Sequence, residues 1–254
     1  MQATRTRRTR ALLAVVSVVV SFAAVDAPRP AAATRTTVDP HKVRWSRTRP
    51  DFIRSVRTTR RAVALSFDDG PGPEDTPRVL DMLRTAGAKA TFFVEGDAAL
   101  TRPDLVRRAV EEGHEVANHT FSHPDLPPLD YRQVVDEVER ASAAIRDAGV
   151  KQVPLFRPPR GLFDREAADA VRSTGHLTVG WDVCLEKYLA RHDDNDAAVA
   201  HALARVKPGS IILAHDGGIP DRERTVQSLP ALLRGLQGKG FEVVTVTELL
   251  RDAR

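Results

Sequence analysis

The side chains best suited to chemistry are two adjacent carboxylates, Asp68 and Asp69, which follow the apolar run 63–67. Two carboxylates this close repel each other unless a cation lies between them, so a divalent metal ion is their natural companion. Adjacent residues of a strand point to opposite faces, and both carboxylates can serve one site only if the chain bends there. The glycines and prolines at 70–73 can supply that bend. The same residues also fit a plain turn or a helix-capping pair.

Two histidines, His119 and His123, are candidate partners for such a metal. Their i, i+4 spacing brings both imidazoles to one side of the chain in a helical turn or an extended segment. Together with one aspartate they form a set of two histidines and one carboxylate, which suits a catalytic zinc with one position left open for water. Zinc lowers the pKa of that water toward about 7. We expect one divalent metal ion, zinc in the first place, with cobalt as the alternative.

Hydrolysis also requires a general base for the water and a general acid for the leaving group. Asp68 and His215 are placed for these roles, because each follows an apolar run, 63–67 and 211–214 respectively. A histidine at the end of a strand also fits a purely structural hydrogen bond. A serine hydrolase is disfavoured because the sequence contains no G-x-S-x-G motif.

The segments that must position these residues alternate between strand and helix. Short apolar runs end in polar or glycine-rich loops and are followed by amphipathic stretches of helical length. This alternation predicts an α/β fold with about seven parallel strands in a closed or nearly closed barrel, whose chemistry lies beyond the carboxyl ends of the strands. The expected strands are 63–67, 90–94, 115–117, 153–156, 177–181, 210–214 and 242–246, and the expected helices are 76–85, 103–112, 130–148, 165–173, 194–206 and 226–237.

Four ordered blocks resemble the polysaccharide deacetylases of carbohydrate esterase family 4, also called the NodB-homology domain. The first motif reads SFDDGP at 66–71, the second HTFSH at 119–123, the third RPPRG at 157–161 and the fifth LAHD at 213–216. The resemblance extends from about residue 62 to residue 250. It implies a deformed (β/α) barrel and a metal-dependent enzyme that removes acetyl groups from N-acetylated glycans.

The resemblance also implies a role for each matching residue. Asp69, His119 and His123 would hold the metal. Asp68 would be the base, oriented by Arg157, and His215 would be the acid that protonates the departing sugar amine. The developing oxyanion would be met by the metal and by the backbone N–H of Arg160. The residues expected to contact substrate are Arg160, Leu213, which would line the pocket for the acetyl methyl group, Pro159 and Trp181.

The third motif departs from the family pattern at Arg160, where a tyrosine is usual. The backbone donor survives this change, whereas an aromatic face for a sugar does not. A guanidinium there could pair with a carboxylate of muramic acid or of a peptide. It could equally be a surface arginine above the loop.

The fourth motif, at 181–188, departs further. Cys184 and Lys187 stand where the family usually has aspartates, and Tyr188 stands where it has tryptophan. The support of the acid His215 is therefore open, and Asp182 or Glu186 could take over. Cys184 is the only cysteine of the chain, so no intrachain disulfide can form.

The N-terminal region has the composition of an export signal. Residues 1–33 combine an arginine-rich start, an apolar run at 11–25 and three alanines at 31–33, which predicts a signal peptide cut after Ala33. As a helix the apolar run would span only about 22 Å, short of a bilayer core of about 30 Å. An uncut anchor and a twin-arginine export route remain alternatives. Residues 34–61 carry nine Lys/Arg against two Asp and are expected to be a basic linker or N-terminal arm, with attachment to an anionic cell-wall polymer as the functional alternative.

Composition limits the remaining possibilities. The chain has 254 residues, of which 42% are hydrophobic and 28% charged, as in a globular protein. Its formal charge of +4 equals that of residues 1–33, which carry five Arg against one Asp, so the charge is poor support for a nucleic-acid partner. We expect a catalytic domain at 62–254 that is monomeric, secreted or attached to the cell wall, and without a membrane span after signal cleavage.

The substrate expected for this domain is an N-acetylglucosamine or N-acetylmuramic acid unit of peptidoglycan or of a chitin-like polymer. An O-deacetylase such as an acetylxylan esterase would show the same motifs. A catalytically silent glycan-binding protein is a third reading, against which the retention of Asp68 and His215 argues.

Overall fold

The structure, a computed structural model, describes residues 43–45, 52–218 and 222–253. These residues belong to one compact unit that spans residues 33–254. The predicted signal peptide and much of the predicted linker lie outside the described residues, so the domain boundaries drawn from the sequence stay predictions. Among the described helices, none is both long enough and apolar enough to cross a bilayer.

A parallel sheet forms the centre of this unit. Seven strands follow one another in the order β7-β6-β5-β4-β3-β9-β8, and β10 pairs with the first residues of β3. The sheet is curled into a half-barrel, which confirms the predicted α/β class with about seven parallel strands. A separate antiparallel pair consists of β1 and β2. The strands are Val43–Trp45 (β1), Ile53–Val56 (β2), Ala62–Gly70 (β3), Ala90–Val94 (β4), Glu115–Asn118 (β5), Leu155–Phe156 (β6), Leu177–Thr178 (β7), Val183–Cys184 (β8), Ile211–His215 (β9) and Glu242–Val244 (β10).

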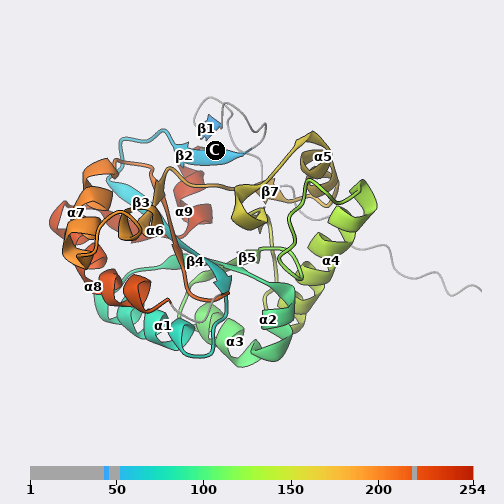
Figure 1. The fold of residues 1–254 in the computed structure, drawn as a ribbon, viewed down its shortest axis with the longest axis horizontal. Coiled ribbons are helices and arrows are strands. Elements are labelled where there is room, and N and C mark those ends of the chain that lie inside the picture. The colour runs from blue at the N-terminus through green and yellow to red at the C-terminus, as the bar shows by residue number, and fades with distance from the viewer. Residues whose placement is uncertain (1–42, 46–51, 219–221, 254) are drawn as a thin grey trace, which may run out of the picture. The chain divides into compact units, whose positions relative to one another are not determined.

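Helices lie around the outside of the strands (Figure 1). Each buries an apolar face, as in α4, where Val134, Val138 and Ile145 are buried at helical spacing. The same helix begins at a capping box, in which the side chains of Asp130 and Gln133 each accept a backbone N–H of the other residue. The helices are Asp75–Ala86 (α1), Gly96–Thr101 (α2), Pro103–Glu111 (α3), Tyr131–Asp147 (α4), Arg165–Ser173 (α5), Leu185–Leu189 (α6), Asn195–Arg205 (α7), Glu223–Gly238 (α8) and Val246–Arg251 (α9).

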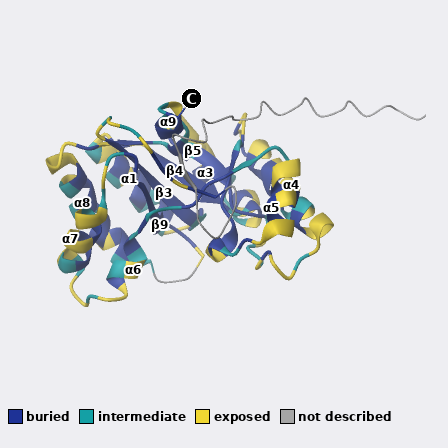
Figure 2. Ribbon diagram, turned by 90° about the horizontal axis from the view of Figure 1, so that it is seen from above, coloured by how far each residue is buried: buried dark blue, intermediate teal, exposed yellow. Residues whose placement is uncertain are grey.

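The core lies between the sheet and these helices. Figure 2 shows the strands almost entirely buried, whereas the helices expose their outer sides. In β3 every residue is buried except Asp69, which is half-buried. A strand covered on both faces reads as a continuous apolar run, which is why the sequence predicts the central strands well.

Residues 52–56, which fall within the predicted linker, are part of this core. Their apolar side chains are at most 3% exposed. Ile53 forms a bridge with Val179, just beyond β7, and Ser55 forms a bridge with Ser210, just before β9. The segment therefore connects the two sides of the curled sheet.

The structure differs from the prediction in its shortest helices and in the lengths of two strands. The helices α2, α6 and α9 were not predicted, and the expected strand 177–181 is reduced to Leu177–Thr178. The expected strand 242–246 ends at Val244, because the side chain of Thr245 caps helix α9 by accepting the backbone N–H of Glu248.

Candidate active site

Both carboxylates of β3 reach the same end of the sheet because the strand bulges at Asp69. Asp68 pairs with Phe93 of β4 and Gly70 pairs with Val94, so the register shifts across Asp69. Asp69 has a φ of 70°, a left-handed conformation that is uncommon for a residue with a side chain. The bulge cancels the alternation that would send the two carboxylates to opposite faces. The bend required by the sequence argument is present.

His119 and His123 enter the site from the loop that follows β5. Nδ1 of His119 lies 2.7 Å from the backbone carbonyl oxygen of Arg157. Because a carbonyl can only accept, Nδ1 carries the proton and the neutral ring keeps Nε2 free as a ligand. The loop itself is held by Glu137 of α4, whose carboxylate accepts two backbone N–H groups and one hydroxyl of residues 121–122.

The free ring nitrogens converge on one carboxylate oxygen. The Nε2 atoms of His119 and His123 each lie 3.3 Å from Oδ1 of Asp69. Zinc binds imidazole nitrogen and carboxylate oxygen at about 2.0–2.1 Å, and tetrahedral geometry then places neighbouring ligand atoms about 3.3–3.4 Å apart. Both the kinds of donor atom and their spacing therefore fit a tetrahedral divalent metal ion.

The electrostatics of Asp69 favour its ionised form. Burial alone would raise its pKa, but the adjacent His119 and His123 outweigh burial and hold the pKa of Asp69 well below its usual range. Only the deprotonated carboxylate binds a metal, so the side chain is in the form that a ligand must have.

Asp68 forms a fully buried ion pair with Arg157. Nη1 of Arg157 donates to Oδ1 of Asp68 at 2.6 Å and to Oγ of Ser66 at 2.9 Å. Nε and Nη2 donate to the backbone carbonyls of Val179 and Gly180 at 3.2 and 3.0 Å. Burial lowers the pKa of Arg157, whereas Asp68 acts against that decrease. The guanidinium is thus fixed on three sides, and it fixes one oxygen of Asp68.

His215, the last residue of β9, faces the same cluster. Its Nε2 lies 3.9 Å from Oδ2 of Asp69, and its Nδ1 lies 3.1 Å from Oε1 of Glu186. Burial lowers the pKa of His215, but Glu186, with Asp68 and Asp69, outweighs burial and raises it. The imidazole is therefore held closer to its protonated form than a free histidine.

The fourth motif resolves into two carboxylates with different surroundings. Glu186, near the start of α6, faces His215, and its Oε1 also accepts the hydroxyl of Thr225 at 3.1 Å. Asp182 instead accepts the backbone N–H of Ile211 at 3.0 Å and the hydroxyl of Ser210 at 3.1 Å, which ties two segments of the sheet together. Of the two carboxylates that the sequence left open, the structure brings Glu186 to the histidine.

The other altered positions of that motif form no hydrogen bond or ion pair with His215 among the described residues. Cys184 pairs in register with Leu213 of β9, and burial raises the pKa of its thiol to about 11. Lys187 is exposed, and Tyr188 packs against the apolar core.

Comparison with known proteins places this geometry in a family. The polysaccharide deacetylase family model matches residues 55–179. A chitooligosaccharide deacetylase of Bradyrhizobium sp. (strain ANU 289) is 40% identical over 200 residues, which cover 74% of this chain and 90% of that protein. The chain belongs to the polysaccharide deacetylase family. It is accordingly a hydrolase of the class that acts on N-acetyl amide bonds.

Two further matches show the range of this family. A peptidoglycan-N-acetylglucosamine deacetylase of Bacillus cereus is 35% identical over 196 residues, covering 77% of this chain and 91% of that protein. A solved structure of a carbohydrate esterase family 4 pseudoenzyme from Bacillus anthracis has 27% identity and a TM-score of 0.72, covering 80% of this chain and 70% of that one. Membership in the polysaccharide deacetylase family thus sets the fold, while activity depends on the side chains at the site.

The four residues expected to contact the glycan differ in their exposure to solvent. Leu213, on β9, and Pro159, in the short 3-10 turn Pro159–Gly161, are buried. Trp181 is half-buried, with its ring edge-on to Phe52 at a centroid distance of 6.0 Å.

The fourth, Arg160, does not present a free cation. Its Nη1 lies 2.5 Å from Oδ1 of Asp125, just after His123, and both side chains are about half exposed. Arg160 also has a φ of 52°. Its charge is therefore shared with a carboxylate at the surface before any substrate arrives.

Two charged residues near the cluster were missed by the sequence analysis. Arg222 donates through Nη2 to Oδ2 of Asp69 at 2.8 Å. Burial raises the pKa of Glu95 to about 7, with His123 acting against the increase and Asp69 adding to it. The position of Glu95 directly after strand 90–94 is a signal that could have found it, because the other site residues also follow strands.

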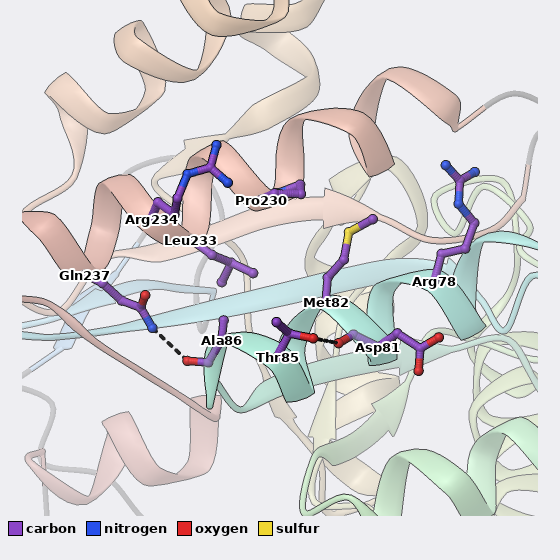
Figure 3. A pocket seen from close by; sticks show the side chains of 9 residues that line it. All are labelled: Arg78, Asp81, Met82, Thr85, Ala86, Pro230, Leu233, Arg234 and Gln237. Carbon is purple, nitrogen blue, oxygen red and sulfur yellow. Dashed lines mark hydrogen bonds between the residues drawn. The ribbon is translucent and has the colours of Figure 1, made fainter.

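A groove of about 520 Å³ lies elsewhere, between α1 and α8 (Figure 3). Its wall is apolar around Met82 and Leu233 and carries Arg78 and Arg234. It contains none of the clustered site residues, so the deacetylase chemistry does not belong to it.

Proposed function

We propose that this chain is a secreted, metal-dependent N-deacetylase that hydrolyses acetamido groups of N-acetylglucosamine or N-acetylmuramic acid units in peptidoglycan or chitin-like glycans. The observation that carries this proposal is the convergence of Asp69, His119 and His123 beside the buried pair of Asp68 and Arg157. The functions of the two relatives, one on chitooligosaccharide and one on peptidoglycan, support the class of substrate.

In this proposal Asp69, His119 and His123 hold one zinc ion. A bound zinc supplies Lewis-acid activation of water and of the acetyl carbonyl group. The three residues contribute two neutral imidazoles and one ionised carboxylate, a set that zinc accepts with a position left open.

Asp68 acts as the general base. Oδ1 is engaged by Arg157 at 2.6 Å, whereas Oδ2 lies on the side of the metal ligands, 3.8 Å from Nε2 of His119. Arg157 fixes the carboxylate so that Oδ2 faces the site, where it can accept a proton from the attacking water. The backbone N–H of Arg160 is proposed to meet the charge that develops on the carbonyl oxygen.

His215 acts as the general acid. The position of Glu186 at 3.1 Å from Nδ1 favours an imidazolium whose other proton, on Nε2, points into the site. An amine leaves an amide only once it is protonated, so an acid held in its charged form suits an N-acetyl substrate. Glu186 is a positioning residue in this step, because it acts through His215.

The cellular setting follows from the same proposal. Residues 1–33 would direct export, and a glycan substrate of the cell wall would be met outside the membrane. We expect the mature protein to act as a monomer at or near the wall, with zinc as its metal and cobalt as a working substitute.

Acetate release tests this function. The purified protein is incubated with zinc or cobalt and with acetylated chitooligosaccharides, peptidoglycan or acetylxylan. Release from the first two supports N-deacetylation, release from acetylxylan alone shows an O-deacetylase, and binding without release shows a silent glycan-binding protein. His119→Ala should lose both stoichiometric metal and activity, and full metal content in that variant would contradict the ligand assignment.

A further inference from the structure

We infer that Arg222 is a positioning residue for the metal centre, because it fixes which oxygen of Asp69 faces the metal. This inference rests on the proposed function to the extent that Asp69 must be a metal ligand. Arg222 precedes α8 and lies far in sequence from the two motifs, at 66–71 and 119–123, that contain Asp69 and the two histidines.

The contacts of Arg222 tie two segments together. Nη2 donates to Oδ2 of Asp69 at 2.8 Å, while Nε donates to the backbone carbonyl of Gly217 at 2.8 Å. The two side chains are 12% and 11% exposed, so this is not a solvated surface pair. A guanidinium holding two acceptors at once has little freedom to rotate.

Two glycines let the arginine's loop approach Asp69 this closely. A Cβ at Gly217 would lie 2.2 Å from the backbone oxygen of Asp69, and one at Gly218 would lie 2.7 Å from the Cβ of Asp69. Gly218 also has a φ of 82°. The backbone of 217–218 therefore packs directly against the bulge, and Arg222 completes the enclosure on the Oδ2 side.

This arrangement divides the two oxygens of Asp69 between two functions. Oδ1 is the oxygen on which His119 and His123 converge, each at 3.3 Å. Oδ2 is occupied by Arg222 and lies 3.9 Å from Nε2 of His215. With Arg222 bound to Oδ2, Asp69 presents Oδ1 to a metal. Because Arg222 already donates to Oδ2, His215 is not required as a hydrogen-bond donor to that oxygen.

Arg222 has two opposite effects on metal affinity. Its positive charge repels a cation, but its hydrogen bond orients the carboxylate before the metal arrives. Asp69 is largely buried in a strained backbone conformation, so we expect the loss of orientation to outweigh the loss of repulsion. Partners of this kind typically contribute about 10–100-fold to metal affinity.

The test compares full-length wild type with Arg222→Ala, Arg222→Lys and the control Arg78→Ala. Arg78 pairs with Glu223, the first residue of α8, at 2.6 Å and has no described contact with Asp69. The control therefore removes the same charge from the same region. The measurements are the zinc dissociation constant by chelator competition, the visible absorption spectrum of the cobalt form, which reports coordination number, and the unfolding temperature without metal.

The inference predicts that Arg222→Ala weakens zinc binding by about 10–100-fold and alters the cobalt spectrum, whereas Arg78→Ala does neither. Arg222→Lys, which retains the charge but replaces the planar guanidinium with a single ammonium nitrogen, should recover part of the affinity. Wild-type affinity, tighter binding, or an equal loss in both alanine variants would overturn it. If Arg222→Ala does not fold, Arg222→Gln takes its place. Absence of stoichiometric zinc in wild type would instead overturn the proposed metal site itself.

Discussion

Replacing Glu186 with glutamine should remove the negative charge that raises the pKa of His215. The carboxylate lies 3.1 Å from Nδ1, and the side chains of His215 and Glu186 are 19% and 22% exposed. Two unit charges about 4 Å apart interact by about 4 kcal/mol at an effective dielectric constant of about 20. Because about a fifth of each side chain meets solvent, we halve this to about 2 kcal/mol. That loss corresponds to a roughly 30-fold increase in the acid dissociation constant of His215.

The pH dependence of kcat/KM measures this change, because its alkaline limb reports ionisation of the acid in the free enzyme. Glu186→Gln should match wild type at low pH, where His215 is protonated in both proteins. It should fall behind by up to about 30-fold at pH values above the wild-type limb. Zinc content and unfolding temperature, measured in parallel, show that the site is intact.

Asp182→Asn is the matched control. It removes a carboxylate from the same motif, but one that accepts from the backbone of Ile211 and the hydroxyl of Ser210 rather than facing His215. We expect lower stability and an unchanged alkaline limb. A Glu186→Gln profile that coincides with wild type, or that falls equally at all pH values, would refute the electrostatic reasoning.

Four other changes address separate features. Asp68→Asn should retain the metal and lose at least about 100-fold in turnover at saturating substrate, and turnover near wild type would exclude Asp68 as the base. Ile53→Ala should cost about 2–5 kcal/mol in urea denaturation, whereas a negligible cost would place residues 52–56 outside the core. Burial lowers the pKa of His114 to about 4. The unfolded chain therefore binds more protons at this histidine between about pH 4 and 6.5, so His114 alone should lower the stability of wild type by about 2 kcal/mol from pH 7.5 to pH 5. His114→Asn should reduce that loss, and equal slopes would contradict the assignment. Arg160→Tyr should move the ratio of kcat/KM about tenfold toward neutral chitooligomers if pairing with a substrate carboxylate is worth about 1.4 kcal/mol, and an unchanged ratio would leave Arg160 as the surface partner of Asp125.

The fold was predictable where local pattern and tertiary role agree. The strands β3, β4 and β9 are buried on both faces and appear in the sequence as continuous apolar runs. The helices α2, α6 and α9 have five or six residues, too few for a helical period to show. The apolar side chains of residues 52–56 are buried because this segment bridges to residues beside β7 and β9. Composition alone does not reveal such long-range contacts.

The site was predictable to the extent that its residues follow strands. His119, His123 and an aspartate were found from residue type and spacing, and the family resemblance named Asp69 as that aspartate. The structure brings the three together. The choice between Asp182 and Glu186 could not be made, because an extended segment would put both on one face. The strand ends at Cys184 and a helix begins, which separates their directions. Arg222 belongs to no recognisable motif, because only the folded chain brings it to Asp69.

A structural neighbour that is a pseudoenzyme raises the question of what distinguishes an active site from a glycan-binding surface on the same fold. Burying Asp68 with Arg157 removes two charges from water, and a buried ion pair of this kind often contributes little or nothing to stability. A binding surface gains nothing from it, whereas a base that must stay ionised and oriented does. The altered fourth motif supports the same distinction. Two aspartates of the usual pattern are absent, yet the carboxylate of Glu186, on α6, still faces His215. Retaining that contact through a different residue argues for a site that still needs its acid.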